Sequence, residues 1–387
     1  MHPSDLPPDH LSALVALRRD LHAHPEIGLT EVRTAEIVAR ELASLGYAVD
    51  RGLAATGVVG TLRKGSGRRA VGLRADMDAL PIAEETNLPY ASRTAGVMHA
   101  CGHDGHTATL LGAAKLLAER CAFDGTVHLI FQPAEENVGG ARIMVEEGLF
   151  RRFPYDAVYA LHNEPGRPLG QFALRDGPIM AAVDEATVTV QGLGGHGAEP
   201  QDTRDSIVAG ASIVMALQTV VSRTVHPMDP IVLTVGAFNG GSASNVIPDR
   251  VALVLGMRSF DPAVRDLLER RIRDLVTAQA ASYGCTAVVD YQRSYDATVN
   301  HPVETETVRR VARRFAGPDQ VVEMARPSMG SEDFAYMLKV VPGSYFFLGA
   351  GMVGKPLHHP GFDFNDALLP IGATFWASLV AEELRAA

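Results

Sequence analysis

The sequence has few cysteines and no excess of basic residues over its 387 positions. The three cysteines, Cys101, Cys121 and Cys285, are an odd number and widely separated, unlike the dense spacing of a secreted disulfide framework. Lys and Arg total 35 against 45 Asp and Glu, and the resulting formal net charge of −10 argues against a nucleic-acid-binding protein. We therefore expect a reducing, cytoplasmic location and no nucleic-acid partner.

The sequence also shows no leader signature and no long apolar run. Its first ten residues, MHPSDLPPDH, contain three prolines and two acidic residues but no Lys or Arg, unlike a secretory signal. No unbroken run of about 18 apolar residues occurs, and from this we predict no membrane-spanning segment and no membrane partner. Hydrophobic residues still make up 47% of the chain, which is enough for the cores of two domains.

Helix and strand patterns alternate through the first part of the chain. Apolar residues at helical spacing predict helices over residues 10–24, after Thr30, and near 104–120 and 140–148. Apolar runs predict strands at 57–63, 70–76, 126–132 and 156–162. This alternation is typical of an α/β domain with a mostly parallel sheet. We assign residues 1–181 and 294–387 to that domain.

Residues 182–293 follow a different order of elements. The pattern is strand, helix, strand, strand, helix, strand, carried by ATVTVQG, DSIVAGASIVMALQTVVSR, PIVLTVGAF, VALVLGMRSF, residues 261–282 and CTAVVDYQ. This order is the ferredoxin-like arrangement. The sequence therefore predicts a smaller α+β domain inserted into the first one.

One short stretch gathers an unusual set of metal-binding side chains. MHACGHDGH, residues 98–106, holds Cys101 and His103 directly before an Ala- and Leu-rich helix, so both side chains can converge at its mouth. Thiolate and imidazole are donors that suit zinc-like metals. We interpret Cys101 and His103 as ligands, and Asp104 and His106 as residues that cap or line the helix.

Further donors follow other predicted strands. Glu135 and Glu136 come where the strand TVHLIFQ ends, His162 ends another, and His358 and His359 follow SYFFLG. Ligands gather at the carboxyl ends of strands in α/β sheets. Adjacent carboxylates point in different directions, so one can bind metal while its neighbour moves a proton. The sequence does not decide which of His358 and His359 is the ligand.

Other catalytic motifs are absent or out of context. GAGMVGK, residues 349–355, matches the pattern GxGxxG, but Lys355 is followed by Pro356 and no helix pattern follows, so a nucleotide site is not expected. No GxSxG, HExxH or PCxxC motif occurs. His22 and His24 lie two residues apart and cannot share a helix face, so we interpret both as structural. Metal-dependent chemistry is left as the strongest hypothesis.

Nine stretches in order resemble the two-metal amidohydrolases, a family that includes hippurate hydrolase, auxin-conjugate hydrolases, aminoacylases and related carboxypeptidases. They are RRDLHAHPEIGLTE, RADMDALPIAEE, MHACGHDGHT, GTVHLIFQPAEE, ALHN, GGHGAEP, SNVIPD, GSEDF and LHHPGFDF. The likeness extends over nearly the whole chain. It implies an α/β catalytic domain of the phosphorylase/hydrolase-like type and an inserted lid that also forms the contact of a homodimer, or of a tetramer.

The resemblance also implies roles for individual residues. The ligands of two divalent ions would be Cys101, His103, Glu136, His162 and His358. Glu135 would be the general base and acid that acts on a metal-activated water. Zinc is the expected ion, with manganese, cobalt or nickel as alternatives, and the bridging atom stays open because the cysteine departs from the broader family.

Four more residues have implied roles around the substrate. Asp78 would orient a ligand, and His196 would stabilise the oxyanion across a dimer interface. Asn245 and Arg258 would hold the free carboxylate of the substrate. Without the resemblance, the preferred interpretation of these residues is structural: His196 as a loop histidine, Asn245 as a turn former and Arg258 as a surface cation.

The expected activity is hydrolysis of the amide bond of an N-acyl amino acid, with an aromatic or aliphatic acyl group. Two alternatives remain. The same groups would serve a metallo-carboxypeptidase or dipeptidase that acts on short peptides. A non-catalytic binding module on the same fold is the third hypothesis, although every expected donor is present in the sequence.

Overall fold

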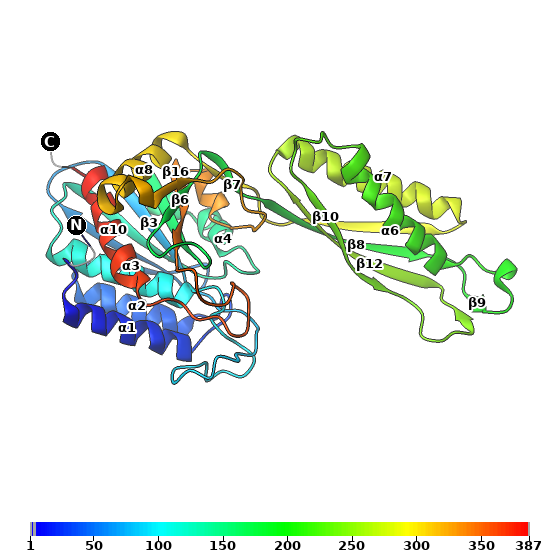
Figure 1. Ribbon diagram of the computed structural model, residues 1–387, viewed down its shortest axis with the longest axis horizontal. Coiled ribbons are helices and arrows are strands. Elements are labelled where there is room, and N and C mark those ends of the chain that lie inside the picture. Colours follow the sequence, from blue (N-terminus) through cyan, green and yellow to red (C-terminus); the bar gives the residue numbers. More distant parts are fainter. Residues whose placement is uncertain (1, 3–4, 386–387) are drawn as a thin grey trace. The chain divides into compact units, whose positions relative to one another are not determined.

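The computed structural model describes residue 2 and residues 5–385 (Figure 1). This part of the chain divides into two compact units, each with its own buried apolar core. Unit 1 contains the residues up to Ile179, Thr298–Pro327 and the residues from Glu332 onward, and unit 2 contains Met180–Ala297 with Ser328–Ser331. The predicted inserted segment, residues 182–293, lies within unit 2.

Unit 1 is built around an eight-stranded sheet. Its strands, in spatial order, are β1 (Ala48–Leu53), β2 (Gly57–Lys64), β4 (Gly125–Gln132), β3 (Ala70–Asp76), β5 (Ala157–Glu164), β16 (Gly343–Gly349), β6 (Phe172–Leu174) and β15 (Val321–Glu323). The central strands β4, β3, β5 and β16 are parallel, whereas β1 and β2 join them in antiparallel pairs. The α/β fold with a mostly parallel sheet is confirmed, and the short strands at both edges were not predicted.

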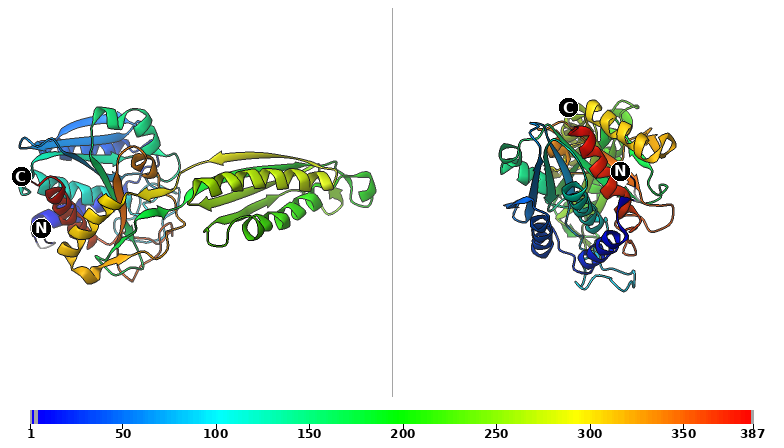
Figure 2. Two further views of the ribbon diagram at one scale, coloured as in Figure 1. Left: turned by 90° about the horizontal axis from the view of Figure 1, so that it is seen from above. Right: turned by 90° about the vertical axis from the view of Figure 1, so that its left-hand side faces the viewer.

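Helices cover both faces of this sheet (Figures 1 and 2). The helices of unit 1 are α1 (Pro8–Ala23), α2 (Val32–Ser44), α3 (His103–Glu119), α4 (Gly140–Glu146), α5 (Leu149–Arg152), α8 (Pro302–Ala316), α9 (Ala335–Leu338) and α10 (Leu368–Glu383). The main core lies between the sheet and α1, α2, α3, α8 and α10, with Phe346 and Trp376 among its largest side chains. This packing fixes α3, whose first residue is His103, directly over the central strands.

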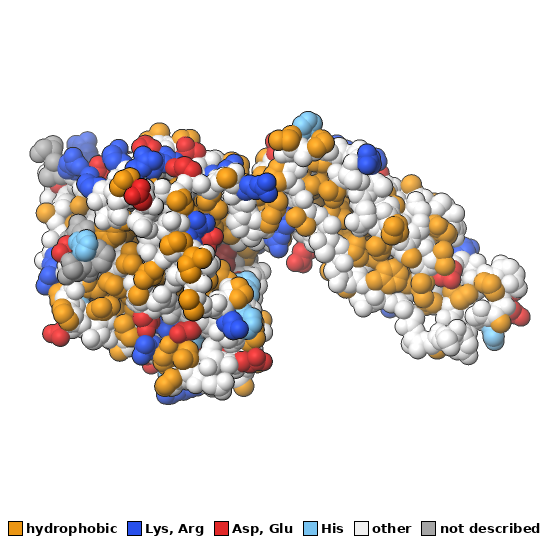
Figure 3. Space-filling view, viewed as in Figure 1, with side chains coloured by type: hydrophobic (Ala, Val, Ile, Leu, Met, Phe, Trp, Pro, Cys, Tyr) orange, Lys and Arg blue, Asp and Glu red, His pale blue; other side chains and the backbone are white. Residues whose placement is uncertain are grey.

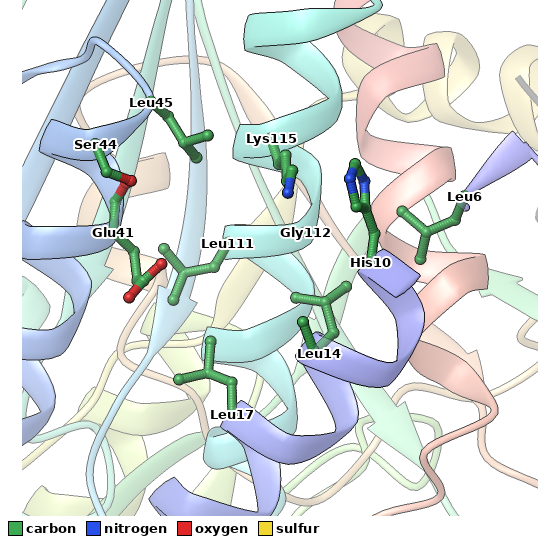
Figure 4. A pocket seen from close by; sticks show the side chains of 11 residues that line it. Leu6, His10, Leu14, Leu17, Glu41, Ser44, Leu45, Leu111, Gly112 and Lys115 are labelled. Carbon is green, nitrogen blue, oxygen red and sulfur yellow. The ribbon is translucent and has the colours of Figure 1, made fainter. Parts of the chain in front are cut away.

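A hollow of about 310 Å³ remains between α1, α2 and α3 (Figure 4). Leu14 and Leu17 of α1, Leu45 beside α2 and Leu111 of α3 point into it, with Lys115 at its border. It contains none of the predicted site residues.

Unit 2 has the element order that the sequence predicts. The elements are β8 (Ala182–Gln191), α6 (Ser206–Arg223), β10 (Val232–Asn239), β12 (Arg250–Ser259), α7 (Pro262–Ser282) and β13 (Thr286–Arg293). The strands form an antiparallel sheet in the order β10-β12-β8-β13, and both helices pack on it. Asp205 and Asp261 begin the two helices by accepting hydrogen bonds from backbone N–H groups of the first turn. β10 is an edge strand of this sheet.

Short strands and turns of helix complete the description. They are β7 (Gly177–Met180), β9 (Gly195–His196), β11 (Val246–Ile247), β14 (Thr298–Asn300) and the 3₁₀ segments Pro200–Asp202 and Pro318–Gln320. β9 pairs with β11, and β7 pairs with β14.

The expectation that no segment could span a membrane was too strict. The helix α6 is long and apolar enough to do so by length and composition, because isolated Ser, Gly, Gln and Thr residues interrupt its apolar run without adding charge. This is weak evidence for a membrane, since core helices pass the same test. One face of α6 is buried against the sheet of unit 2 through Ala209, Ile213, Leu217 and Val220.

Candidate metal centre

The predicted donors of unit 1 come together where the central strands end. Three groups of side chains have potential ligand atoms that all lie within 4.8 Å of one another: Cys101, His103 and His162; Cys101, Glu136 and His358; and His103, Glu135 and Glu136. These groups share members, so the five predicted metal donors and Glu135 form one connected cluster. The segments that carry them follow β3, β4 and β16 or lie in β5, whose carboxyl ends meet at one edge of the sheet.

The entry into α3 is set by a glycine. Gly102 has a φ of 93°, and a Cβ there would lie 2.6 Å from Oδ1 of Asn163, so only glycine fits between Cys101 and His103. The start of α3 has no side-chain cap. Of the two expectations for Asp104 and His106, that they cap or line this helix, capping is therefore wrong, because both side chains turn to other partners in the buried interior.

Asp78 contacts two of the predicted donors. Its Oδ1 lies 3.2 Å from Nδ1 of His103, and its Oδ2 accepts a hydrogen bond of 2.9 Å from the backbone N–H of Glu136. Nε2 of His103 then faces Oε1 of Glu136 at 3.7 Å. Both atoms are buried and have no hydrogen-bond partner within the described residues. Buried polar atoms are normally satisfied, so this donor pair fits a cation.

Two further histidines complete the cluster. Nδ1 of His162 is 2.8 Å from the carbonyl of Asn163, and this hydrogen bond leaves Nε2 facing Sγ of Cys101 at 3.4 Å. Nε2 of His358 lies 3.4 Å from Oε2 of Glu136. His359 instead accepts a hydrogen bond from Gly361 within its own loop. Of the two neighbouring histidines, His358 is therefore the one that faces the cluster.

The electrostatics of the cluster favour added positive charge. Burial raises the pKa of the Cys101 thiol well above its usual range, and Glu136 and Glu135 add to that shift. Burial also raises the pKa of Glu135, helped by the nearby carboxylates of Glu332 and Glu136. Burial alone would lower the pKa of His103, but Asp76 and Asp78 among others raise it to about 10. Divalent cations would oppose these shifts, because a bound cation favours thiolate and carboxylate over their protonated forms.

A buried ionic network that the sequence did not predict lies beside Glu135. Arg74 of β3 is fully buried and donates to Asp76 at 2.7 Å, to Glu332 at 2.9 Å and to Asp333 at 3.2 Å. Glu135, Glu332 and Asp333 also lie within 4.8 Å of one another. The available signal was an arginine inside the apolar strand AVGLRAD together with two adjacent acids in GSEDF, since a buried arginine needs carboxylate partners.

Three other buried residues support the histidines. Nδ1 of His106 is 2.6 Å from Oδ1 of Asp76, and its Nε2 is 2.6 Å from Oδ1 of Asn163. The ring of His106 contacts that of His162 edge-on, with ring centroids 4.6 Å apart. His106 thus lines the first turn of α3 and packs against a predicted ligand. The repeated acid in RADMD was the signal that could have identified Asp76.

The three predicted substrate residues of unit 2 do not form one group. His196 lies opposite Val246 in an exposed two-stranded ribbon, where the carbonyl of Asn245 accepts a 2.8 Å hydrogen bond from Gly197. Arg258 lies near the far end of β12, where it donates to Ser331 at 3.2 Å. Arg258 is eight positions after Arg250 in β12, a span of roughly 27 Å at about 3.4 Å per residue. Within unit 2, His196 and Asn245 are therefore neighbours and Arg258 is remote from them.

Comparison with known proteins identifies the family of the chain. A family model described as Peptidase family M20/M25/M40 matches residues 72–382. The chain belongs to this family. It is 40% identical to hippurate hydrolase of Campylobacter jejuni subsp. jejuni, covering 95% of this chain and 96% of that protein. It is also 40% identical to the IAA-amino acid hydrolase ILR1-like 2 of Arabidopsis thaliana, covering 98% and 87%.

A solved structure extends the likeness to the fold. The YxeP protein of Bacillus subtilis, described as a dinuclear metal binding peptidase from the M20 family, superimposes with a TM-score of 0.84 at 32% identity. The match covers 98% of this chain and 99% of that one. The family membership and the fold class expected from the sequence are both confirmed.

Proposed function

We propose that this member of the M20/M25/M40 family is a metal-dependent amidohydrolase that releases the amino acid from N-acyl amino acids. The observation that carries the proposal is the single connected cluster of thiolate, imidazole and carboxylate donors beside the buried carboxyl of Glu135. The two enzymes named above, which act on hippurate and on an indole-acetic acid conjugate by their names, support an acyl amino acid as the substrate.

The donor set would hold two divalent ions. Cys101, His103 and His162 form one group, and Cys101, Glu136 and His358 form the other, so the thiolate of Cys101 is common to both. Thiolate and imidazole favour zinc, and manganese, cobalt or nickel are the alternatives. When bound, such ions polarise the scissile carbonyl and make water more acidic. The dinuclear description of the related YxeP protein supports two ions.

Glu135 is the proton carrier in this proposal. Its carboxylate takes a proton from the attacking water and later gives it to the leaving amine. The turn before it is fixed, since Ala134 has a φ of 55° and its N–H donates to the buried carboxylate of Glu31 at 2.8 Å. A non-glycine residue in that region is strained, and such strain occurs at functional sites. The strained turn aims Glu135 inward rather than toward water.

The remaining substrate contacts come from a homodimer. His196 and Asn245 lie on an exposed ribbon remote from Arg258, so one copy of unit 2 does not offer all three to one substrate. We assign His196 and Asn245 to the site of the partner, where His196 donates to the oxyanion while Asn245 and Arg258 hold the substrate carboxylate.

The dimer contact that we propose is the apolar face of α6 and β10. Hydrophobic side chains gather on the face of unit 2 shown in Figure 3. Met215 is 71% exposed and Val208 is 47% exposed, and together with Phe238 they belong to a face that contains a shallow hollow of about 590 Å³. Exposed apolar patches and open sheet edges mark association sites. A second copy covers this face in a dimer, and pairs of dimers would give a tetramer.

A substrate panel tests the activity. The protein is reconstituted separately with zinc, manganese, cobalt and nickel, and amino-acid release is measured from hippurate, N-acetyl amino acids and dipeptides. We expect release from the N-acyl substrates. The second candidate is a carboxypeptidase or dipeptidase, which the peptidase description of YxeP favours, and faster cleavage of the dipeptides would select it. If the metal-loaded protein releases no amino acid from any of them, the non-catalytic binding module becomes the better description.

Complementation tests the shared site. His196→Ala and Glu135→Gln protein are each expected to be nearly inactive. If His196 serves the partner's site, mixed dimers contain one site with both groups intact and recover part of the activity. Heterodimers that form correctly but show no recovery would place His196 and Glu135 in the same subunit's site, whereas a fully active His196→Ala protein would remove His196 from the mechanism.

A further inference from the structure

A second buried cluster in unit 1 involves the first helix of the chain. Arg18 of α1 is fully buried, and its guanidinium lies against three carboxylates from two other segments. His22 is one turn further along α1 and is also fully buried. Neither residue lies among the groups of potential metal ligands. Burial of a guanidinium is costly unless its partners are well placed, so the arrangement has a structural or functional reason.

The first set of contacts of Arg18 is with the start of α3. Nε of Arg18 donates to Oδ2 of Asp104 at 2.9 Å, and Nδ1 of His22 lies 2.8 Å from the same oxygen. Asp104 is the second residue of α3 and directly follows His103. A carboxylate in the first turn is also favoured by the helix dipole. The cluster therefore fixes the helix turn that carries His103.

The second set of contacts of Arg18 is with the loop that carries His358. Nη2 of Arg18 donates to Oδ1 of Asp363 at 2.5 Å, and Nη1 approaches Oδ1 of Asp366 at 3.4 Å. The hydroxyl of Tyr90 donates to the second oxygen of Asp363 at 2.8 Å. Both acids belong to the segment 350–367 between β16 and α10. Asp363 is five positions after His358, so the guanidinium anchors the loop close to the candidate ligand.

Two contacts extend this docking toward the metal centre. The ring of Phe364 lies against the backbone of Gly105 in α3, at a place where any Cβ would meet the ring. The backbone N–H of His358 donates to the carbonyl of Ala100 at 2.8 Å. His358 has a φ of 63°, which a histidine adopts only when its surroundings hold it there. The loop is thus docked on the segment that begins with Ala100 and continues into α3.

We propose that Arg18 is a positioning residue that sets the spacing between the His358 side and the His103 side of the metal centre. One guanidinium contacts the carboxylate that follows His103 and two carboxylates of the loop that carries His358, so it fixes the separation of these segments without touching an ion. Loss of the contacts between Arg18 and the loop should lower the affinity for the ion of the donor group that contains His358. The ion of the other donor group, which contains His103 and His162, should stay bound. The inference rests on the proposed function, because it presumes the two donor groups described there.

The test releases the loop and leaves Arg18 paired with Asp104. In the double variant Asp363→Asn and Asp366→Asn, both side chains keep their size, and both are partly exposed, at 32% and 19%. Asp20→Asn is the matched control, because it breaks an exposed α1 ion pair with Arg33. Metal content after dialysis and calorimetric zinc titration give the number of ions and their affinities. Changes to groups that orient ligands typically cost about 10–100-fold in metal affinity.

We expect the wild type and the control to bind two ions tightly. In the double variant, one ion should stay tightly bound and the affinity for the other should fall by about 10–100-fold. Unchanged binding of both ions, or equal weakening of both, would overturn the role of Arg18. If the double variant does not fold, Tyr90→Phe is used in its place, since it removes only the hydrogen bond from the Tyr90 hydroxyl to Asp363. It should lower the affinity for the same ion, but by less than the double variant. A wild type that binds fewer than two ions would contradict the proposed metal centre instead.

Discussion

Replacement of Glu135 by Gln should separate catalysis from metal binding. The amide keeps the size of a side chain that is only 7% exposed, but it cannot accept the proton of the attacking water. General acid–base groups contribute about 10²–10⁴-fold to the rate, or about 2.7–5.4 kcal/mol of activation free energy. The two donor groups that contain Cys101 do not include Glu135. We therefore expect kcat to fall by that factor while two ions remain bound.

The same variant should be more stable than the wild type when no metal is present. Burial and the carboxylates of Glu332 and Glu136 raise the pKa of Glu135, so the folded state disfavours its charged form. A raised pKa makes the folded wild type lose stability as pH rises above the unfolded value of about 4.3, whereas Gln does not titrate. The advantage of the variant should be absent near pH 4 and grow toward pH 8. Bound cations should reduce this stability advantage, because they offset the repulsion between Glu135 and the neighbouring carboxylates.

Thermal unfolding and steady-state kinetics measure the two effects on the same samples. Chelated wild type and Glu135→Gln protein are compared from pH 4 to pH 8, where each kcal/mol corresponds to about 2–4 °C for a domain of this size. Glu119→Gln, at an exposed position in α3, is the matched control and should change neither quantity. Turnover within a few-fold of wild type would remove Glu135 as proton carrier, and a metal-free variant less stable than wild type would refute the electrostatic reasoning.

Three other perturbations test separate parts of the proposal. Cys101→Ala should lower the affinity for both ions, because Cys101 belongs to both donor groups. If elemental analysis still finds two bound ions, Cys101 is a thiol of the core and not a ligand. Removal of the metal by a chelator should lower Tm, since an ion at 100 times its Kd stabilises by about 2.7 kcal/mol, and an unchanged Tm would indicate that no ion binds at the centre. Met215→Lys should shift the protein toward monomers in sedimentation and reduce turnover. The control is Val303→Lys in unit 1, where the side chain is 74% exposed, and it should change neither quantity. A dimer that is unaffected by Met215→Lys would remove α6 from the interface.

The sequence predicted the candidate donors and one residue that supports them, Asp78, but not the rest of the supporting network. The strand-end positions suggested that donors such as Cys101 and His103 could meet, because the ends of parallel strands share an edge, and the family resemblance supplied the role of Glu136. Arg74 and Glu332 are 258 positions apart in the chain, and no local pattern relates them. Their pairing depends on which strand lies next to which. That information is in the sheet order rather than in any single segment.

The choice between His358 and His359 shows the same limit at shorter range. Both are histidines in one loop, and composition cannot separate adjacent side chains. The distinction comes from the backbone, because a φ of 63° at His358 and its hydrogen bond to Ala100 turn this side chain toward Glu136. Arg18 and His22 lay in a helix whose burial could be predicted only in part. Their partner Asp104 lies at the start of α3 as expected, but the sequence did not predict that its side chain faces α1.

The supporting residues also explain why metal binding and folding should be coupled. Arg74 pairs with Asp76, Glu332 and Asp333, and it also interacts electrostatically with Glu135. The pKa of Glu135 is nevertheless raised, because burial and the neighbouring carboxylates disfavour its charged form. Divalent ions in the candidate centre would favour the charged form and so offset part of this cost to folding. In the proposed mechanism, the buried position of Glu135 therefore also couples the stability of the folded protein to ion binding.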